Sequence, residues 1–97
     1  MNPKENPEID VVEELDEVVE HVKLWTLVVF NDDINTFDHV IDTLIDVCGH
    51  EGTQAEQCAM IIHLKGKCAV NSGEYDELVT QRNKICERGI SAEVMIK

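Results

Sequence analysis

Basic residues are scarce in this 97-residue sequence: eight Lys and Arg side chains stand against 20 Asp and Glu, and the formal net charge at pH 7 is −12. A surface of that charge repels nucleic-acid phosphates and anionic lipid headgroups, which excludes both as partners. A partner with a cationic group is favoured instead. Eight of the acids, with one lysine, fall within residues 1–21, so the negative charge is concentrated at the start of the chain.

Long apolar runs are also missing. No window approaches the roughly 18 to 20 consecutive apolar residues of a membrane span, and the start of the chain lacks the apolar core of a signal peptide. We therefore expect a soluble, cytoplasmic protein that is not exported. The length matches one domain, and a domain of this size buries only about 60 to 65% of its unfolded surface on folding.

The four cysteines do not form the short C-x2-C pairs that structural zinc sites usually show. Reduced thiols that act as small hydrophobes are the better interpretation, and no metal or cofactor is expected. The positions are Cys48, Cys58, Cys68 and Cys86. A zinc site of mixed ligands stays open as an alternative and would draw on Cys58, His63, Cys68 and either Cys48 or His50.

Motifs of catalysis are absent as well: the sequence has no Gly-rich phosphate loop, no HExxH and no GxSxG. Cys58 and His63 are the one candidate nucleophile and base. They share a predicted helix at a spacing of five residues, which turns their side chains to different sides of the helix. We therefore expect no enzymatic activity.

Residues 1–22 are predicted to be an acidic, disordered extension, and residues 23–97 a folded core domain. Two prolines and a run of acids favour disorder in the extension. Five apolar side chains nevertheless recur there at helical spacing and would form the docking stripe if the extension binds a partner. They are Val11, Val12, Leu15, Val18 and Val19.

The core domain begins with a predicted strand over Leu24–Phe30, which is rich in large apolar and β-branched residues and reads as at least partly buried on both faces. A polar loop follows, in which Asn35 or Thr36 is placed to cap the next helix. That helix is predicted over Phe37–Cys48 from its apolar spacing, with Gly49 as its stop.

The remaining elements are read from similar signals: a capping-box spacing between Thr53 and Glu56, glycine stops and alternating apolar residues. They are a helix over 53–65, a brief strand over 68–70, a turn over 71–73, a helix from Tyr75 that stops by Gly89, and a strand over 91–96. The order predicts an α+β two-layer domain, in which a three-stranded antiparallel sheet packs against three helices on one face.

The loop and the end of the second helix carry the polar groups of interest. An ammonium group donates three hydrogen bonds, and an Asn carbonyl, an Asp carboxylate and a neutral His nitrogen could accept them. Each residue also has a plainer interpretation: Asn31-Asp32-Asp33 as a turn before a helix cap, and His63 as a partner of the last helical carbonyls. The sequence alone leaves both interpretations open.

These residues also carry a family resemblance. The Asn31-Asp32-Asp33 triplet, the Thr36–Val40 segment and the later Ile62-His63-x-x-Gly66 together resemble the bacterial adaptor ClpS. The likeness covers about residues 23–97, and residues 1–22 match only as a variable extension. It is fairly specific, because the triplet and the distant His-x-x-Gly must occur together.

The resemblance implies a ClpS-like fold and a non-enzymatic adaptor of the N-degron pathway. Such an adaptor binds a destabilising first residue, typically Leu, Phe, Tyr or Trp, and delivers the substrate to an AAA+ unfoldase of the ClpA or ClpC class with its ClpP peptidase. It also implies that the substrate α-amine is held by Asn31, Asp33 and His63, with Asp32 close by. The substrate side-chain pocket would be formed by Val29, Thr36, Phe37, Val40, Ala59, Ile62 and Ile90. The extension would engage the unfoldase.

Two departures from the family pattern affect specificity. Asn35-Thr36-Phe37 replaces the usual Thr-Pro-Met, and Ala59 stands where many members carry a Met that rejects β-branched side chains. We therefore expect a pocket narrowed by Phe37 and opened by Ala59, with relaxed selection between Leu and Ile.

The competing interpretation is an acidic protein-interaction module that does not read amino-termini. Ribosomal stalk protein domains have a similar small α+β layout and acidity. Acetylation of the peptide α-amine separates the two, because a side-chain groove tolerates it and an ammonium site does not. In either case we expect a monomer.

Overall fold

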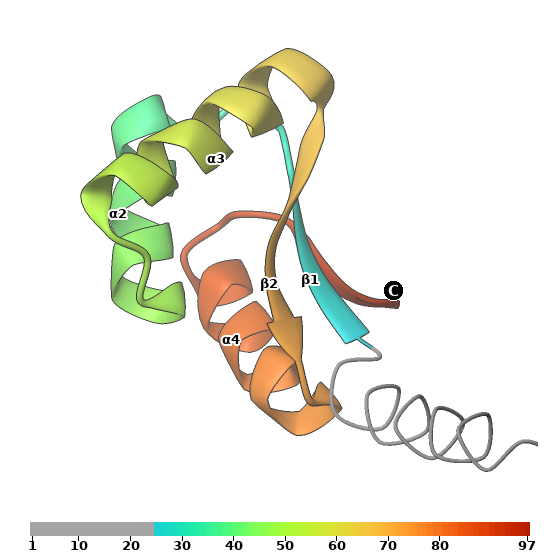
Figure 1. Cartoon of the computed structure of the whole chain (residues 1–97). Helices are drawn as coiled ribbons and strands as arrows, with labels where there is room; N and C mark the ends of the chain where they lie inside the picture. The colour runs from blue at the N-terminus through green and yellow to red at the C-terminus, as the bar shows by residue number, and fades with distance from the viewer. Residues whose placement is uncertain (1–24) are drawn as a thin grey trace, which may run out of the picture.

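The computed structural model describes residues 25–97 and confirms the α+β class; the predicted extension over residues 1–22 lies outside the described residues (Figure 1). Within the described part, no helix is long and apolar enough to cross a membrane. The elements are β1 (Trp25–Phe30), α2 (Phe37–Cys48), α3 (Gly52–Lys65), β2 (Lys67–Gly73), α4 (Tyr75–Glu87) and β3 (Ala92–Ile96).

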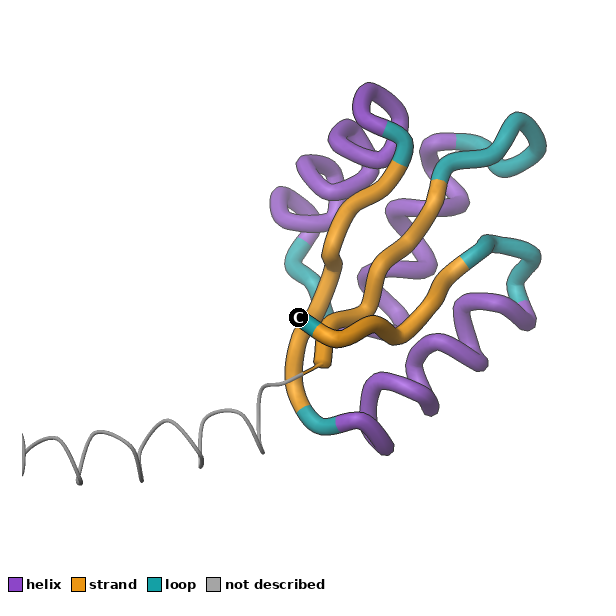
Figure 2. The backbone as a smooth tube through the Cα atoms, turned by 90° about the vertical axis from the view of Figure 1, so that its right-hand side faces the viewer, coloured by secondary structure: helices purple, strands orange, loops and turns teal. Residues whose placement is uncertain are grey.

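Strand β1 is the centre of the sheet, whose order is β2-β1-β3 with both pairings antiparallel. Figure 2 shows the three strands in front and the helices behind them, which gives the two layers that the sequence predicts. Leu27, Val28 and Val29 are all buried, so β1 is covered on both of its faces, as expected from its unbroken apolar run.

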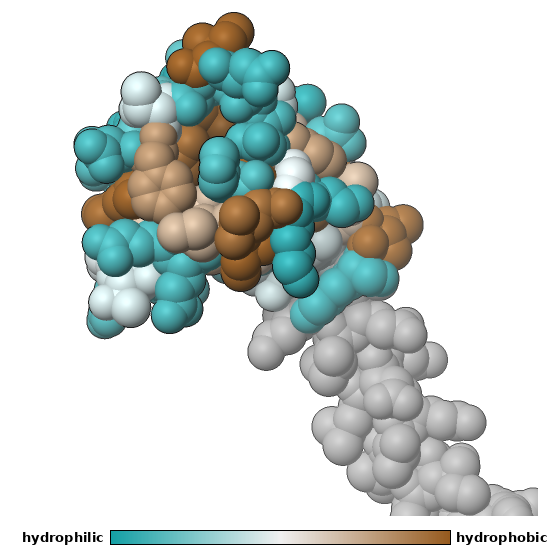
Figure 3. Space-filling model, turned by 90° about the horizontal axis from the view of Figure 1, so that it is seen from above, coloured by the Kyte–Doolittle hydropathy of each residue, from teal (hydrophilic) through white to brown (hydrophobic). Residues whose placement is uncertain are grey.

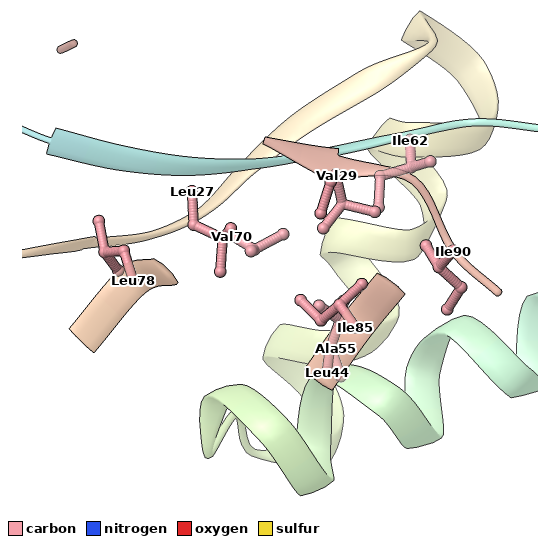
Figure 4. Close-up of a cluster of buried hydrophobic side chains, with 10 residues drawn as sticks. Leu27, Val29, Leu44, Ala55, Ile62, Val70, Leu78, Ile85 and Ile90 are labelled. Atoms are coloured by element: carbon pink, nitrogen blue, oxygen red, sulfur yellow. The ribbon is translucent and has the colours of Figure 1, made fainter. Parts of the chain in front are cut away.

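The core lies between the sheet and the helices (Figure 4). Leu27 of β1, Leu44 of α2 and both Leu78 and Ile85 of α4 are fully buried. Burying an aliphatic side chain of this size contributes about 1.5–3 kcal/mol to stability, so the core holds the sheet and the three helices in place. The full cluster is Leu27, Val29, Leu44, Ala55, Ile62, Val70, Leu78, Ile85, Ile90 and Ala92.

Helix α2 has the predicted bounds, and its two ends explain why. The Thr36 hydroxyl accepts a hydrogen bond of 3.0 Å from the His39 backbone N–H, which caps the first turn. Gly49 ends the helix with φ of +72°, a left-handed conformation that glycine adopts without steric cost. Of the two predicted caps, the structure uses Thr36.

Two boundary predictions were wrong. Helix α3 begins at Gly52 with Glu51 as its cap and no side-chain capping bond, so the proposed capping box at Thr53 is not formed. The sequence 71–73 is not a turn, because β2 continues through it to Gly73. Continued pairing with β1 explains the longer strand: Asn71 lies opposite Leu27, after an irregularity in the register between Leu27 and Val28.

All four cysteines are free thiols. Cys48, Cys58 and Cys68 are half-buried and pack against the core, whereas Cys86 is exposed. Burial, and then the nearby Cys58, raise the pKa of the Cys48 thiol and that of the Cys68 thiol to about 11 each. These two thiols are therefore uncharged at neutral pH and act as small apolar side chains.

Candidate functional site

A cavity of about 470 Å³ opens where the loop after β1 meets α2 and the last turns of α3. Seen from above, the surface of the molecule carries separate hydrophobic and hydrophilic patches (Figure 3). The lining residues are Asn31, Asp32, Asp33, Asn35, Thr36, Phe37, Val40, Ala59, Ile62 and His63. Segments that are distant in the sequence thus share one hollow.

Backbone hydrogen bonds bring the loop to the end of α3. The Asn31 N–H donates to the Gly66 carbonyl at 2.9 Å, and the Phe30 N–H donates to the Ser91 carbonyl at 3.0 Å. Gly66 in turn ends α3 with φ of +92° and donates to the Ile62 carbonyl. Because His63 lies three residues before Gly66, this arrangement places Asn31 and His63 on the same cavity.

Asp32 is committed to building the loop. Its Oδ1 accepts hydrogen bonds from the backbone N–H groups of Ile34 and Asn35, both at 2.8 Å, and its Oδ2 accepts one from the Asn35 side-chain amide at 2.7 Å. These bonds, led by the one from the Asn35 backbone, hold the pKa of Asp32 below its usual value of 3.8. Asp32 therefore shapes the loop as an Asx turn does.

Unlike Asp32, the other three predicted amine ligands have side chains that are not engaged in hydrogen bonds within the loop. Within residues 25–97, the side chains of Asn31, Asp33 and His63 form no hydrogen bond or ion pair with any other group. All three are exposed and line the cavity. They present an amide oxygen, a carboxylate and an imidazole nitrogen, which are acceptors suited to a cation with several N–H donors.

Apolar side chains form the rest of the cavity lining. Ala59 and Ile62 are each 3% exposed, and Val40 is half-buried and packs against the core. Phe37 is 40% exposed, a large exposed fraction for an aromatic ring, so its contacts with the rest of the domain are incomplete. An apolar ligand group could complete those contacts.

The structure does not bring every predicted pocket residue to the cavity. Val29 and Ile90 are 1% and 3% exposed, and they belong to the core cluster rather than to the lining (Figure 4). Ile62 belongs to that cluster and also lines the cavity. Val29 and Ile90 therefore lie in the same core as a lining residue, but they do not line the cavity themselves. Asn35 lines the cavity and was not predicted to do so, because its place in a polar loop before a helix suggested only a cap.

Among the residues of the alternative zinc site, the Cys58 thiol lies near those of Cys48 and Cys68. Within the described residues, no group of three or more His, Cys, Asp or Glu is placed to hold a metal ion. His50 is buried and its Nε2 donates to the Val70 carbonyl at 2.8 Å, so it has a structural partner. His63 lines the cavity, whereas Cys58 packs against the core.

A smaller groove of about 240 Å³ lies between α4 and β3. Its cationic group already has partners: the Arg82 Nε–H donates to the Ala92 carbonyl at 3.3 Å, and the Arg82 Nη1 donates to Asn83 at 3.0 Å. The ring of Trp25 packs edge-on against that of Tyr75, with 4.8 Å between centroids. The lining residues are Tyr75, Val79, Arg82, Glu93 and Val94.

Known proteins of one family resemble this chain in sequence. The family model described as "ATP-dependent Clp protease adaptor protein ClpS" matches residues 20–93. The ClpS adapter protein of Corynebacterium aurimucosum is 30% identical over 91 residues, which cover 94% of this chain and 82% of the relative. That of Rhodococcus jostii is 28% identical over 91 residues, which cover 94% and 80%.

A solved structure shares the fold. Agrobacterium tumefaciens ClpS2 bound to L-phenylalaninamide superimposes with a TM-score of 0.74 at 20% sequence identity. The match covers 77% of this chain and 98% of the ClpS2 chain. The three-stranded sheet and its helical layer are therefore common to both proteins.

Proposed function

The chain belongs to the family of ClpS adaptors of the ATP-dependent Clp protease, and from this premise we propose that its cavity reads the first residue of N-degron substrates. In this proposal the cavity binds the free α-amine together with a large hydrophobic first side chain. The protein then delivers the substrate for degradation and performs no chemistry itself.

The observation that carries the proposal is the group of three side chains, Asn31, Asp33 and His63, that have no partner within residues 25–97 and line one cavity. An α-ammonium group donates three hydrogen bonds, one to each. Charge-assisted hydrogen bonds contribute about 1.5–3 kcal/mol each, so the set would distinguish a free amine from an amide.

The apolar side of the cavity supports the second half of the proposal. Phe37, Val40, Ala59 and Ile62 lie on the same hollow as the acceptors. Fully burying a side chain of Leu or Phe size contributes about 1.5–3 kcal/mol. The ligand in the Agrobacterium tumefaciens ClpS2 structure, L-phenylalaninamide, combines an α-amine with an aromatic side chain, which is the pair of groups proposed here.

The expected affinity is micromolar. Three charge-assisted hydrogen bonds and one buried side chain give a gross gain that association entropy and side-chain ordering reduce substantially. A dissociation constant of about 1 µM corresponds to about −8.2 kcal/mol. Such an affinity suits an adaptor that must release its substrate.

Membership of the family also supports a proposal about the partners of the protein. We infer that the protein works in the cytoplasm as a monomer, with an unfoldase of the ClpA or ClpC class and the ClpP peptidase. Residues 1–22, the acidic extension outside the described residues, would engage the unfoldase, while residues 23–97 form the substrate-binding core domain. The excess of acids over bases fits recognition of a cationic terminus.

One titration tests the proposal. Fluorescence anisotropy would measure the binding of peptides that begin with Phe or Leu, each with a free α-amine and each acetylated. We expect micromolar binding of the free peptides and at least thirtyfold weaker binding of the acetylated ones. Equal binding of both forms would reject the ammonium site and support the acidic interaction module.

A further inference from the structure

Asn35 joins two parts of the chain that lie 54 residues apart. Its side-chain amide donates to the Asp32 Oδ2 at 2.7 Å and to the Gly89 carbonyl at 2.8 Å, which uses both of its N–H groups. Its backbone N–H donates to the other carboxylate oxygen of Asp32. One residue thus ties the loop that carries Asn31 and Asp33 to the turn between α4 and β3.

That turn has hydrogen bonds of its own to α2 and α4. The His39 Nε2 donates to the Arg88 carbonyl at 2.9 Å, and the Arg88 guanidinium pairs with Asp46 at 3.1 Å. Gly89 has φ of +86°, and its N–H donates to the Cys86 carbonyl at 2.9 Å. An ideal Cβ on Gly89 would lie 4.0 Å from the Asn35 side-chain oxygen, which shows how closely the two segments approach.

The two aspartates of the triplet differ because of this arrangement. The Asn35 side-chain amide donates to the Asp32 Oδ2, and the backbone N–H groups of Ile34 and Asn35 donate to its Oδ1. Both oxygens of the Asp32 carboxylate are therefore hydrogen-bonded within the loop. Asp33, which follows directly, has no such partner within residues 25–97 and lines the cavity. Asn35 therefore separates a carboxylate that shapes the loop from one that can meet a ligand.

We propose that Asn35 is a positioning residue for amine recognition: by bridging Asp32 and the Gly89 carbonyl, it fixes the loop so that Asp33 and Asn31 meet the substrate ammonium in a preset arrangement. This inference rests on the proposed function, since it assigns how that site is held in shape. In this proposal Asn35 acts through the loop, because its two amide hydrogens join Asp32 to the Gly89 carbonyl. A loop fixed before binding loses less conformational entropy when the ligand arrives.

Two substitutions isolate the donated hydrogen bonds. Asn35→Asp keeps the shape of the side chain but replaces the amide donor by an acceptor, which then faces the Asp32 carboxylate and the Gly89 carbonyl. Asn35→Ala removes the side chain without adding repulsion. We expect affinity for a free Phe-started peptide to fall about tenfold or more in Asn35→Asp and about threefold to tenfold in Asn35→Ala.

The chain offers a matched control. Asn71 also donates its side-chain amide across elements, to Gln81 at 2.9 Å, and it does not line the cavity. Asn71→Ala should leave peptide affinity within twofold of wild type. Circular dichroism at the assay temperature shows which variants are fully folded, and affinities are compared among those. If Asn35→Asp is not fully folded, Asn35→Ala decides the question.

Amide hydrogen exchange supplies a readout that general destabilisation would not reproduce. In the Asn35 variants the Ile34 and Asn35 backbone N–H groups, which donate to Asp32, should exchange faster, while the amides of β1 keep their protection. If wild type distinguishes free from acetylated peptide, and Asn35→Ala and Asn35→Asp both bind the free peptide within twofold of wild type, this inference is overturned and the proposed function is left intact. An equal loss in Asn71→Ala would overturn it as well. If wild type itself does not distinguish free from acetylated peptide, both proposals fall.

Discussion

Two hollows of mixed polarity lie toward opposite ends of strand β1, and they differ in the hydrogen-bond partners of their polar side chains. In the groove beside Tyr75, Arg82 already donates to Ala92 and Asn83, and the Trp25 ring packs against Tyr75. In the cavity beside Asn31, the amide, carboxylate and imidazole acceptors have no partner within residues 25–97. The cavity therefore offers three acceptor side chains without partners in the described residues, whereas the guanidinium of the groove is already paired.

The same contrast recurs between adjacent residues. Asp32 and Asp33 are identical in chemistry and both line the cavity. Asp32 accepts three hydrogen bonds from its own loop, whereas Asp33 accepts none within the described residues. Substituting one or the other should therefore produce different defects, in stability for the first and in binding for the second.

The largest expected effect comes from removing an acceptor in the cavity. His63→Ala and Asp33→Ala should each weaken binding of a free Phe-started peptide by about 2 kcal/mol or more, because each leaves a desolvated ammonium short of a partner. Glu93→Ala, in the opposite groove, is the control and should bind within twofold of wild type. Isothermal titration would measure all three, and wild-type affinity in His63→Ala would remove the histidine from the site.

The next effect concerns the shape of the apolar wall. Ala59 is buried and lines the cavity, and in the proposed function its small side chain would leave room for a β-branched first residue. We expect wild type to prefer Leu over Ile by less than a hundredfold, about 2.7 kcal/mol, and Ala59→Met to raise that preference about tenfold, about 1.4 kcal/mol. Competition between Leu- and Ile-started peptides measures the ratio. A wild-type preference above a hundredfold would contradict relaxed selection.

A smaller effect separates the two aspartates by stability. Asp32→Asn should lower the free energy of unfolding at pH 7 by about 1 kcal/mol, because the charged acceptor is lost, whereas Asp33→Asn should leave it unchanged. The pKa of Asp32 is lowered from 3.8 on folding, so its contribution is present above pH 3.8 and is lost as pH falls through the lowered value.

Denaturant titrations from pH 7 to pH 2 would test this pH dependence. The acid-induced loss of stability should be smaller in Asp32→Asn than in wild type, since the titrating group is gone. Asp33→Asn serves as the control and should follow the wild-type curve. If both variants lose stability equally, the distinction between the two carboxylates is wrong.

The smallest effect is expected at the surface ion pair between Arg88 and Asp46, whose side chains are 37% and 56% exposed. Solvent screens such pairs, so Arg88→Gln should cost less than about 0.5 kcal/mol of stability. Peptide affinity should stay within twofold of wild type, because the Arg88 carbonyl that accepts from His39 is retained. A loss of more than about 1 kcal/mol would show that the turn between α4 and β3 depends on this pair.

Much of the fold could be predicted because local signals and packing agree. The apolar run of β1 and the spacing in α2 gave nearly the observed bounds, since the residues that favour each element also form its buried face. The length of β2 could not be predicted locally. Asn71 and Ser72 are typical of turns, but they continue the strand because β1 offers them partners at Leu27 and Thr26.

The candidate site was predictable as a set of residues but not as an arrangement. Family resemblance suggested the triplet and His63, and the structure places them on one cavity. The resemblance already set Asp33 apart from Asp32 as an amine ligand, but it could not show that the Asp32 carboxylate accepts three hydrogen bonds from Ile34 and Asn35. Likewise, the burial of Val29 away from the cavity follows from how the sheet packs against the helices, which no local pattern encodes.

The most direct test of the central claim is a double-mutant cycle between Asp33 and the substrate amine. Wild type and Asp33→Asn would each be titrated with a free and an acetylated Phe-started peptide, and the coupling free energy calculated from the four affinities. We predict a coupling of about 1.5 kcal/mol or more, because the carboxylate and the ammonium contact each other. A coupling near zero, with wild type binding both peptides equally, would contradict the account.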